Sequence, residues 1–493
     1  MRILQVSAEI FPLLKTGGLA DVAGALPGAL AALGEDVRLL LPGFPAMLAG
    51  VNDLVPVAEF DAPWGERFRL LHGMFSPPSG PAGTEVAPRL HAYLIEAPGL
   101  YDRPGNPYED ASRRPHADNA RRFALLGWAA ALLAQGLDGY WRPELVHSHD
   151  WHAALAPAYL AFARFGGARR PASIFTIHNL AYQGLFAPSD FGGLGLPEAA
   201  FDVDGVEYHG QLSFMKGGLY YADRLTTVSP TYAEEIQTPE QGCGLDGLLR
   251  ARGGVLHGIL NAVDDAVWNP ATDALLSQRY DARRPGGKAR CKAALQAELG
   301  LAEAADALLF VIVSRLTEQK GLHLVLGGID ELLAQGGQLA VLGSGEAWLE
   351  AAFRERAAAH PGKVSVTIGY DEPLAHRLFA GSDVTLVPSL FEPCGLTQLY
   401  GLKYGSLPLV RRVGGLADTV VDCTLEDMAS GAATGFVFDG FDAPGYARAV
   451  RRAFALHARA PDWRRVRATA MRRPADWRTA AEQYVGVYRK ALA

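Results

Sequence analysis

Two glycine-marked junctions stand near opposite ends of the 493-residue chain. The first, residues 15–22 (KTGGLADV), follows the apolar run 3–8, and the second, residues 391–397 (FEPCGLT), follows 383–389. Where a strand turns directly into a helix, free backbone N–H groups and the positive end of the helix dipole lie at the junction, and glycine lets a ligand approach the backbone. Each junction is therefore typical of a loop that binds an anionic or polar ligand. Two of them in separate halves of the chain predict a ligand held in a cleft between two domains.

Apolar runs of strand length alternate with helical segments through both halves of the chain. Such near-continuous apolar runs are typical of parallel strands that helices cover on both faces. Strands are expected at residues 2–8, 36–41, 90–95, 145–148, 173–177 and 225–228, and again at 308–313, 339–342, 364–368, 384–387, 407–410 and 435–438. Two βαβ series in tandem predict an α/β protein with two doubly wound, Rossmann-like domains.

The chain is longer than one hydrophobic core usually supports, which also favours two domains. We expect an N-terminal domain over residues 1–262 and a C-terminal domain over 263–475. A last amphipathic helix within 476–493 is expected to pack back on the N-terminal domain. The Pro- and Gly-rich segment 64–88 suggests an irregular hairpin or loop insertion, and segment 101–116 is expected to be a long loop, either a lid or plain surface.

Composition excludes several classes of protein. The formal net charge of -7 gives no sign of a nucleic-acid partner, and the basic clusters near the C-terminus have the spacing of solvated helix faces. The four cysteines form no CxxC pair, which argues against a disulfide framework or a zinc cluster. The N-terminus lacks a secretion signal, and no run of about 18 apolar residues predicts a membrane span. We therefore expect a soluble, cytoplasmic protein that needs no metal or other cofactor.

Charged residues follow two of the strands expected in the second half. Arg315 and Lys320 come after the strand at 308–313, where two fixed cations five residues apart can flank a diphosphate. Glu392 precedes the second glycine junction, where a carboxylate can accept hydrogen bonds from vicinal sugar hydroxyls. The same residues are also compatible with an exposed cation pair and a helix-capping acid. Their position at strand ends favours the ligand-binding interpretation, with backbone N–H groups of Gly395, Leu396 and Thr397 as further donors.

Histidines, a carboxylate and aromatic rings gather at two strand ends of the first half. His149-Asp150-Trp151-His152 ends one strand, and His178-Asn179 ends the next. Rings combined with hydrogen-bonding groups suit carbohydrate, whose C–H faces pack on aromatic side chains. A metal site is the alternative, but two histidines at i and i+3 without a third ligand do not make a zinc pattern. His178 alone is equally compatible with a hydrogen-bonded core histidine.

Longer stretches of the sequence resemble a known family. They are KTGGLADVAGALP (15–27), YDRPGNPY (101–108), HDWHAALAPAYL (149–160), TIHNLAYQGLF (176–186), GQLSFMKGGLYYAD (210–223), SRLTEQKG (314–321), PSLFEPCGLTQLYGLKYGSLPLVRRVGGLADTV (388–420) and TGFVF (434–438). In this order they resemble the ADP-glucose-dependent bacterial glycogen and starch synthases, which are retaining glucosyltransferases with the GT-B fold. The resemblance implies two Rossmann-like domains facing across a deep cleft. It also implies transfer of glucose from ADP-glucose to the non-reducing end of an α-1,4-glucan such as glycogen, with release of ADP.

The resemblance also implies roles for individual residues. It assigns diphosphate neutralisation to Arg315 and Lys320, positioning of the donor glucose to Glu392, and a place beside the reacting carbon to His178. The remaining residues that it implicates are Lys15, Gly17 and Gly18 on the sugar nucleotide with Asp21 nearby, Asp150, His152 and Asn261 on glucose or the acceptor, Tyr370 on adenine, and Tyr101 on the acceptor. Cys394, next to Gly395 in the second junction, is also expected to bind substrate.

The chain has no DxD-like acidic pair at a strand end, so we expect a metal-independent reaction. No carboxylate is a compelling nucleophile, which favours front-face attack over double displacement. Alternative functions are a related enzyme that uses UDP-glucose, a phosphorylase and a catalytically inactive glucan-binding protein. A nicotinamide-dependent oxidoreductase is disfavoured because the segment 343–345 (GSG) lacks the third glycine of the dinucleotide motif. The sequence gives no oligomeric state.

Overall fold

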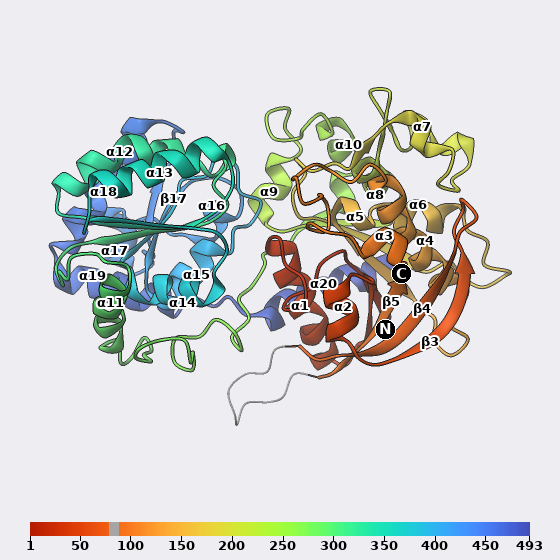
Figure 1. Ribbon diagram of the computed structural model, residues 1–493, viewed down its shortest axis with the longest axis horizontal. Helices are drawn as coiled ribbons and strands as arrows, with labels where there is room; N and C mark the ends of the chain where they lie inside the picture. The colour runs from red at the N-terminus through yellow and green to blue at the C-terminus, as the bar shows by residue number, and fades with distance from the viewer. Residues whose placement is uncertain (78–87) are drawn as a thin grey trace. The chain divides into compact units, whose positions relative to one another are not determined.

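The computed structural model describes residues 1–77 and 88–493, and the chain divides into two compact units. Unit 1 comprises Met1–Asn261 together with Trp477–Ala493, and unit 2 comprises Ala262–Asp476. Figure 1 draws unit 1 mainly in red to yellow-green and unit 2 in green to blue. Each unit is built on its own sheet.

The sheet of unit 1 has nine strands in the order β12-β11-β7-β6-β1-β2-β5-β4-β3. All neighbours are parallel except at one edge, where β3 and β4 and then β4 and β5 run antiparallel. The strands are β1 (Arg2–Val6), β2 (Asp36–Pro42), β3 (Asn52–Asp61), β4 (Arg67–Phe75), β5 (Leu90–Glu96), β6 (Leu145–His149), β7 (Ala172–Ile177), β11 (Arg224–Thr227) and β12 (Leu256–Gly258). A separate small antiparallel sheet joins β8 (Leu185–Phe186), β10 (Gln211–Ser213) and β9 (Glu207–Tyr208).

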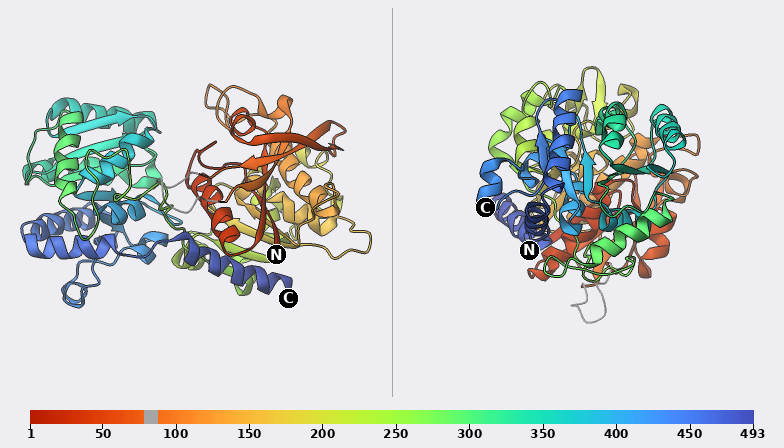
Figure 2. Two further views of the ribbon diagram at one scale, coloured as in Figure 1. Left: turned by 90° about the horizontal axis from the view of Figure 1, so that it is seen from below. Right: turned by 90° about the vertical axis from the view of Figure 1, so that its left-hand side faces the viewer.

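Helices cover both faces of this sheet. One face carries α4 (Asn119–Gln135), α5 (Asp150–Ala153), α6 (Leu155–Phe162) and α8 (Phe214–Tyr221), and the other carries α1 (Gly18–Ala32) and α20 (Trp477–Leu492). The last helix of the chain, α20, packs on α1 and on β7, and Figure 2 shows it in dark blue beside the red α1. It follows that the two ends of the chain complete the same unit.

The sheet of unit 2 has six parallel strands in the order β15-β14-β13-β16-β17-β18. They are β13 (Leu309–Val313), β14 (Gln338–Gly343), β15 (Val364–Ile368), β16 (Val384–Val387), β17 (Leu407–Arg411) and β18 (Phe436–Phe438). One face carries α12 (Leu322–Ala334), α13 (Ala347–Ala359) and α18 (Ala443–His457), and the other carries α11 (Gly287–Glu298), α14 (Glu372–Gly381), α15 (Thr397–Tyr404) and α19 (Ala460–Met471). This is the doubly wound arrangement that the apolar runs predict.

The chain crosses from one half of each sheet to the other between two adjacent central strands, β1 and β6 in unit 1 and β13 and β16 in unit 2. At such a switch point the loops that leave the two central strands diverge to opposite faces, and an open α/β sheet binds its ligands there. The two glycine junctions follow β1 and β16. We call the carboxyl ends of the parallel strands around these points the unit 1 edge and the unit 2 edge.

A strand occupies every place where the sequence predicts one, with ends that differ by at most two residues. Three strands of this sheet were not predicted: β4 lies within segment 64–88, which was expected to be an irregular hairpin or loop insertion, β3 precedes that segment, and β12 is a short strand at the other end of the sheet. Strand β3 is an outer strand with Pro56 at a register shift, a position where proline costs no ladder hydrogen bond. Residues 78–87 of that expected insertion lie outside the described part of the chain.

Candidate active site

At the unit 2 edge, an ion pair joins the loops that follow the two central strands. Lys320, after β13, places its Nζ 2.6 Å from Oε2 of Glu392, after β16. The exposed fractions of the two side chains are only 16% and 8%, so both charges are largely withdrawn from water. Burial of an ion pair costs desolvation energy that the pair alone seldom recovers. Such a pair is better explained by a ligand that needs fixed charge than by stability.

The Glu392 loop is held from several sides. Ser389 donates its hydroxyl to Oε2 of Glu392 at 2.9 Å, and Gln319 donates its side-chain amide to the Phe391 carbonyl at 3.2 Å. A Cβ on Gly414 would lie 2.0 Å from the Glu392 carbonyl oxygen, and one on Gly415 would lie 2.3 Å from that of Cys394. The glycine pair is therefore required for helix α16 (Gly414–Thr419) to press against this loop.

The second glycine junction has the expected form of a strand, a turn and a helix N-terminus. Gly395 has φ +74°, a left-handed conformation that favours glycine, and α15 begins at Thr397. The Thr397 hydroxyl donates to the Val313 carbonyl at 3.1 Å, which ties α15 to the end of β13. Leu396 is half-buried, whereas Cys394 is buried at 4% exposure and its carbonyl accepts from Gln398. We therefore expect the junction to offer a ligand its first-turn N–H groups rather than the cysteine thiol.

Two predicted ligand residues of unit 2 are exposed at the ends of strands that β14 separates in the sheet. Arg315 follows β13, and Tyr370, with 71% of its surface exposed, follows β15. Tyr370 donates its hydroxyl to Glu372. An exposed tyrosine ring at a strand end is available for stacking on a planar ligand group.

At the unit 1 edge, the first glycine junction is organised around a buried carboxylate that the sequence analysis missed. Glu9 accepts from the Thr16 backbone N–H at 2.7 Å, from the Thr16 hydroxyl and from the Tyr108 hydroxyl. Lys15 forms an ion pair with Asp21 at 2.8 Å, within the first turn of α1. Gly17 has extended backbone and nothing within 4 Å of where a Cβ would stand, so the protein itself does not require glycine there. The prediction that a ligand approaches the backbone at Gly17 is compatible with this open space.

The remaining groups at the unit 1 edge are buried and mostly uncharged. Burial lowers the pKa of His178 to about 3 and holds that of His152 well below its usual range. Burial also raises the pKa of the Asp150 carboxyl to about 8, although the Trp151 backbone N–H donates to it at 3.0 Å. Asp150 has φ +59°, which an aspartate tolerates better than most residues and which turns its side chain at the end of β6.

Two polar atoms at this edge are buried without a partner among the described residues, namely Nδ1 of His152 and Oδ1 of Asn261. Buried polar atoms are nearly always hydrogen-bonded, so an orphan at a predicted site points to a missing ligand. The His152 ring stacks on Tyr108 with their centroids 4.6 Å apart. Tyr101, by contrast, is 1% exposed and donates its hydroxyl to the Arg122 carbonyl at 2.8 Å. Its assignment to the acceptor stays a prediction, and Tyr108 of the same loop is the tyrosine that reaches the strand ends.

Apart from Tyr101, which is buried against Arg122, the sequence-predicted residues lie in two sets, one at each edge. Residues missed from the sequence are Glu9, Tyr108, Ser389 and Gln319, which hold the predicted ones in place. Glu9 carried a usable signal, because it is an acid between apolar residues just past a strand. Tyr108 and Gln319 act through contacts between loops that no local pattern reveals, whereas Ser389 acts within the Glu392 loop, three residues from the carboxylate.

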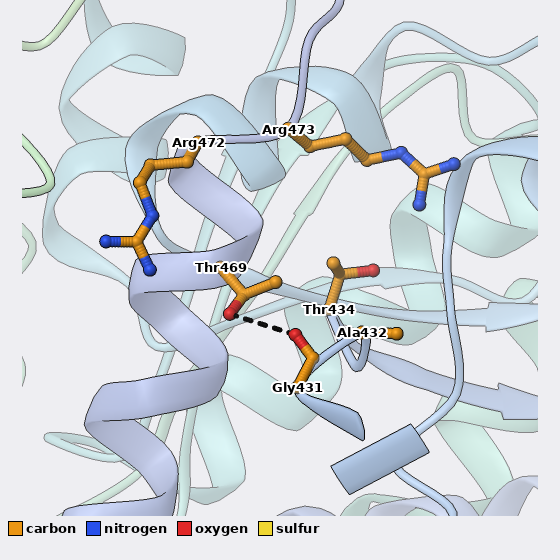
Figure 3. Close-up of a pocket in the computed structure, with 6 residues that line it drawn as sticks. All are labelled: Gly431, Ala432, Thr434, Thr469, Arg472 and Arg473. Carbon is orange, nitrogen blue, oxygen red and sulfur yellow. Dashed lines mark hydrogen bonds between the residues drawn. The ribbon is translucent and has the colours of Figure 1, made fainter. Parts of the chain in front are cut away.

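A cavity of about 350 Å³ lies elsewhere in unit 2, and Figure 3 shows its lining. It is formed by Gly431, Ala432, Thr434, Thr469, Arg472 and Arg473, none of which belongs to the predicted site. Arg472 and Arg473 point in different directions, and Arg473 donates to the Asp418 carbonyl.

Across residues 1–77 and 88–493, no cluster of three or more His, Cys, Asp or Glu side chains has the arrangement of a metal site. Among the helices of these same residues, none has the length and apolar character to cross a membrane.

Comparison with known proteins defines the class first. Residues 2–251 match the family described as starch synthase catalytic domain, and residues 307–455 match glycosyl transferases group 1. The fold is similar to the catalytic domain of starch synthase IV from Arabidopsis thaliana bound to ADP and acarbose, with a TM-score of 0.89, 31% identity, and coverage of 100% of this chain and 99% of that one. It is also similar to sucrose-phosphate synthase from Thermosynechococcus elongatus, with a TM-score of 0.58, 18% identity, and 99% and 98% coverage, which bears on fold alone. The protein is therefore a glycosyltransferase of the GT-B class.

Full-length relatives define the family. The chain is 75% identical to a glycogen synthase of Variovorax paradoxus (strain S110), over 100% of this chain and 99% of the relative. It is 58% identical to a glycogen synthase of Leptothrix cholodnii, with 100% of both chains covered. The chain belongs to the glycogen synthase family. This confirms the family and the fold class that the sequence motifs indicate.

Proposed function

We propose that this chain transfers glucose from ADP-glucose to the non-reducing end of an α-1,4-glucan, with release of ADP and retention of the anomeric configuration. Membership of the glycogen synthase family supports the overall reaction. The observation that carries the assignment of groups is the buried Lys320–Glu392 pair at the switch point of unit 2.

The chemical demand of this reaction is charge separation. The bond between glucose C1 and the β-phosphate oxygen breaks, so that positive charge grows on the sugar ring and negative charge on the diphosphate. Lys320 and Arg315 are assigned to the diphosphate, together with the first-turn N–H groups at Gly395, Leu396 and Thr397. A unit charge 4 Å away contributes about 4 kcal/mol at an effective dielectric near 20, before desolvation is subtracted. Groups held in place beforehand need no reorganisation as the charge develops.

Glu392 has two roles in this proposal. In the ligand-free protein it neutralises Lys320, and in the complex it accepts hydrogen bonds from hydroxyls of the donor glucose while the diphosphate shares the lysine. The Ser389 hydroxyl keeps Oε2 oriented during this exchange. Tyr370 is assigned to the adenine ring, which an exposed tyrosine can stack on.

The unit 1 edge is assigned to uncharged hydroxyl groups of glucose and the glucan. His152 and Asn261 offer buried orphan atoms, and Asp150 and His178 stand at the ends of neighbouring strands. Lys15, Gly17, Gly18 and Asp21 are assigned to the sugar nucleotide, where Gly17 leaves room for it.

Retention follows most simply from front-face attack. The O4 hydroxyl of the glucan bonds to C1 on the face that the diphosphate leaves, and its proton passes to the departing phosphate oxygen. No residue supplies a covalent intermediate in this scheme. The fixed cations take the place of a metal ion, so turnover is proposed to be metal-independent.

A donor-competition assay tests the proposal. Purified protein is given glycogen primer with ADP-glucose, UDP-glucose or glucose 1-phosphate, and release of ADP, UDP or phosphate is followed with and without EDTA. We expect ADP-glucose to be strongly preferred and EDTA to have no effect. Preference for UDP-glucose, phosphate release from glucose 1-phosphate, or a loss of turnover in EDTA that magnesium restores would each contradict a different part of the proposal.

A further inference from the structure

A line of buried polar groups runs through the core of unit 1 and ends at His178. Nε2 of His178 lies 3.0 Å from Nδ1 of His149, and Nε2 of His149 lies 2.6 Å from Oε1 of Gln5. The Gln5 amide then donates to the Tyr488 hydroxyl at 3.1 Å, and this hydroxyl lies 2.7 Å from Nδ1 of His147. We call these five residues the relay.

The relay joins distant parts of the sequence. Gln5 lies on β1, His147 and His149 on β6, and His178 just past β7, whereas Tyr488 lies on α20 at the far end of the chain. Gln5 and Tyr488 are 483 positions apart. The Tyr488 side chain is fully buried, and α20 packs on β7 and α1. The last helix of the chain therefore supplies one member of a network that reaches the predicted catalytic residues.

The relay defines where its protons lie. Burial lowers the pKa of His178 and His147 to about 3 and that of His149 well below its usual range, so each imidazole is neutral and carries one N–H. Because the Gln5 oxygen is an acceptor only, His149 carries its proton on Nε2 and presents a lone pair on Nδ1. His178 must then donate from Nε2, which leaves its own Nδ1 as an acceptor. At the other end, the Tyr488 hydroxyl accepts from Gln5 and donates to His147.

Once the orientation of the Gln5 amide is set, each member of the relay has one arrangement of hydrogen-bond donors and acceptors that matches its neighbours. The two ends of that amide differ, and Tyr488 is the partner of its donor end. If the hydroxyl were lost, Gln5 would have no acceptor for that end and could turn over, which would reverse the proton on His149 and then on His178. The proton of the His178 imidazole would then no longer be held on Nε2.

We propose that Tyr488 is a positioning residue for glucosyl transfer: through Gln5 and His149 it holds the His178 ring in one orientation, with the proton on Nε2 and an acceptor lone pair on Nδ1. This inference rests on the proposed function in placing His178 beside the reacting carbon. It adds to that function a role for α20, which then positions a residue of the active site as well as packing on the sheet. A purely structural network would stabilise unit 1 without affecting the tautomer of His178.

Three variants test the relay. Tyr488→Phe removes the hydroxyl and keeps the ring, and Gln5→Met breaks the relay at its amide with a side chain of similar volume. Tyr484→Phe is the matched control, because Tyr484 is a buried tyrosine of the same helix that contacts His147 through its ring, with centroids 5.5 Å apart. The double variant Gln5→Met/Tyr488→Phe completes a cycle. Thermal unfolding of each variant checks that unit 1 remains folded.

The first readout is steady-state turnover with ADP-glucose and glycogen. For Tyr488→Phe and Gln5→Met we expect kcat to fall roughly tenfold, which is within the cost of small misplacements of reacting groups, while KM for ADP-glucose changes little. The double variant should be no slower than the slower single variant, because both break the same relay. Equal kcat values for Tyr488→Phe and Tyr484→Phe, or fully additive losses in the double variant, would overturn the proposal.

The second readout is independent of activity. In protein with ¹⁵N-labelled histidine, the ring nitrogen shifts report the tautomer of His178, with His178→Gln used to assign its signals. We expect the Nε2–H form in the wild type and in Tyr484→Phe, and a mixed or reversed form in Tyr488→Phe. The Nδ1–H form in the wild type, or an unchanged spectrum in Tyr488→Phe, would overturn the relay. Failure of the proposed function would instead appear as absence of ADP release by the wild type, with these spectra unaffected.

Discussion

The unit 1 edge and the unit 2 edge are built alike and differ in charge. Each lies at the switch point of a doubly wound sheet, and each carries a glycine junction that leads into a helix. Each edge carries one lysine–carboxylate ion pair, Lys15–Asp21 in unit 1 and Lys320–Glu392 in unit 2. The unit 2 edge adds the exposed Arg315, whereas burial keeps the imidazoles of the unit 1 edge neutral and raises the pKa of Asp150 to about 8. The same topology thus supports two kinds of recognition. Fixed charge suits a diphosphate that becomes more negative as it leaves, and neutral polar groups suit sugar hydroxyls.

Removal of the lysine at the unit 2 edge should have the largest effect. We expect Lys320→Met to lower kcat/KM for ADP-glucose by about 100-fold or more, as loss of one preorganised donor to a developing anion does in other enzymes. The variant also leaves Glu392 buried without its cation, so Lys320→Met/Glu392→Gln separates charge loss from misfolding. Lys403→Met is the control, because Lys403 pairs with the exposed Asp265. It should change kcat/KM by less than about twofold, and a comparable loss in both single variants would refute the charge assignment.

Asp150 of the unit 1 edge should make the free energy of unfolding depend on pH. In the unfolded chain Asp150 ionises near its ordinary pKa of 3.8, whereas in the folded protein burial raises its pKa to about 8. Between these values the folded state holds a proton that the unfolded state has lost, so the contribution of Asp150 to stability falls as pH rises. The difference in the free energy of unfolding between Asp150→Asn and the wild type should therefore shift in favour of the variant by up to about 1.4 kcal/mol for each pH unit in that window.

A buried aspartate of unit 2, Asp273, serves as a control because its effect on stability changes with pH in the opposite direction. Burial alone would raise the pKa of Asp273, but hydrogen bonds from His376 and Tyr404, each at 2.7 Å, lower it. Its stabilising contribution is present above its unfolded pKa and is lost as pH falls below about 4. Denaturant midpoints measured across this pH range should separate Asp150→Asn from Asp273→Asn. Parallel pH profiles for the two variants would mean that Asp150 is not held protonated.

A smaller effect is expected from the orphan nitrogen of His152. His152→Phe keeps a ring against Tyr108 and removes Nδ1, and we expect kcat/KM to fall roughly five- to tenfold, the value of one neutral hydrogen bond of about 1 kcal/mol. Tyr159→Phe is the control, because it loses one buried hydrogen bond, to the Leu194 carbonyl, away from the strand ends. Equal kcat/KM values for His152→Phe and the wild type would remove His152 from the glucose side of the site.

The sequence predicts the parallel strands of both units because strands that helices cover on both faces consist of consecutive apolar residues. It also predicts that polar residues lie at the ends of those strands. It predicts Lys320 and Glu392 separately but not as partners, because their contact depends on β13 and β16 being neighbours in the sheet. It misses β3 and β4, whose mixed pattern with Pro56 is typical of an edge. The relay leaves no local signal either, since Gln5 and Tyr488 meet only in the folded unit.

The most direct test of the division between charged and neutral edges is the affinity of the full chain for ADP, measured by titration calorimetry on the wild type, Lys320→Met and His152→Phe. ADP carries the diphosphate and lacks the transferred glucose. We expect Lys320→Met to weaken ADP binding by about ten- to 100-fold, because one charge-assisted contact is lost. It predicts that His152→Phe leaves ADP affinity at the wild-type value. Unchanged affinity in Lys320→Met, or an equal loss in His152→Phe, would contradict it.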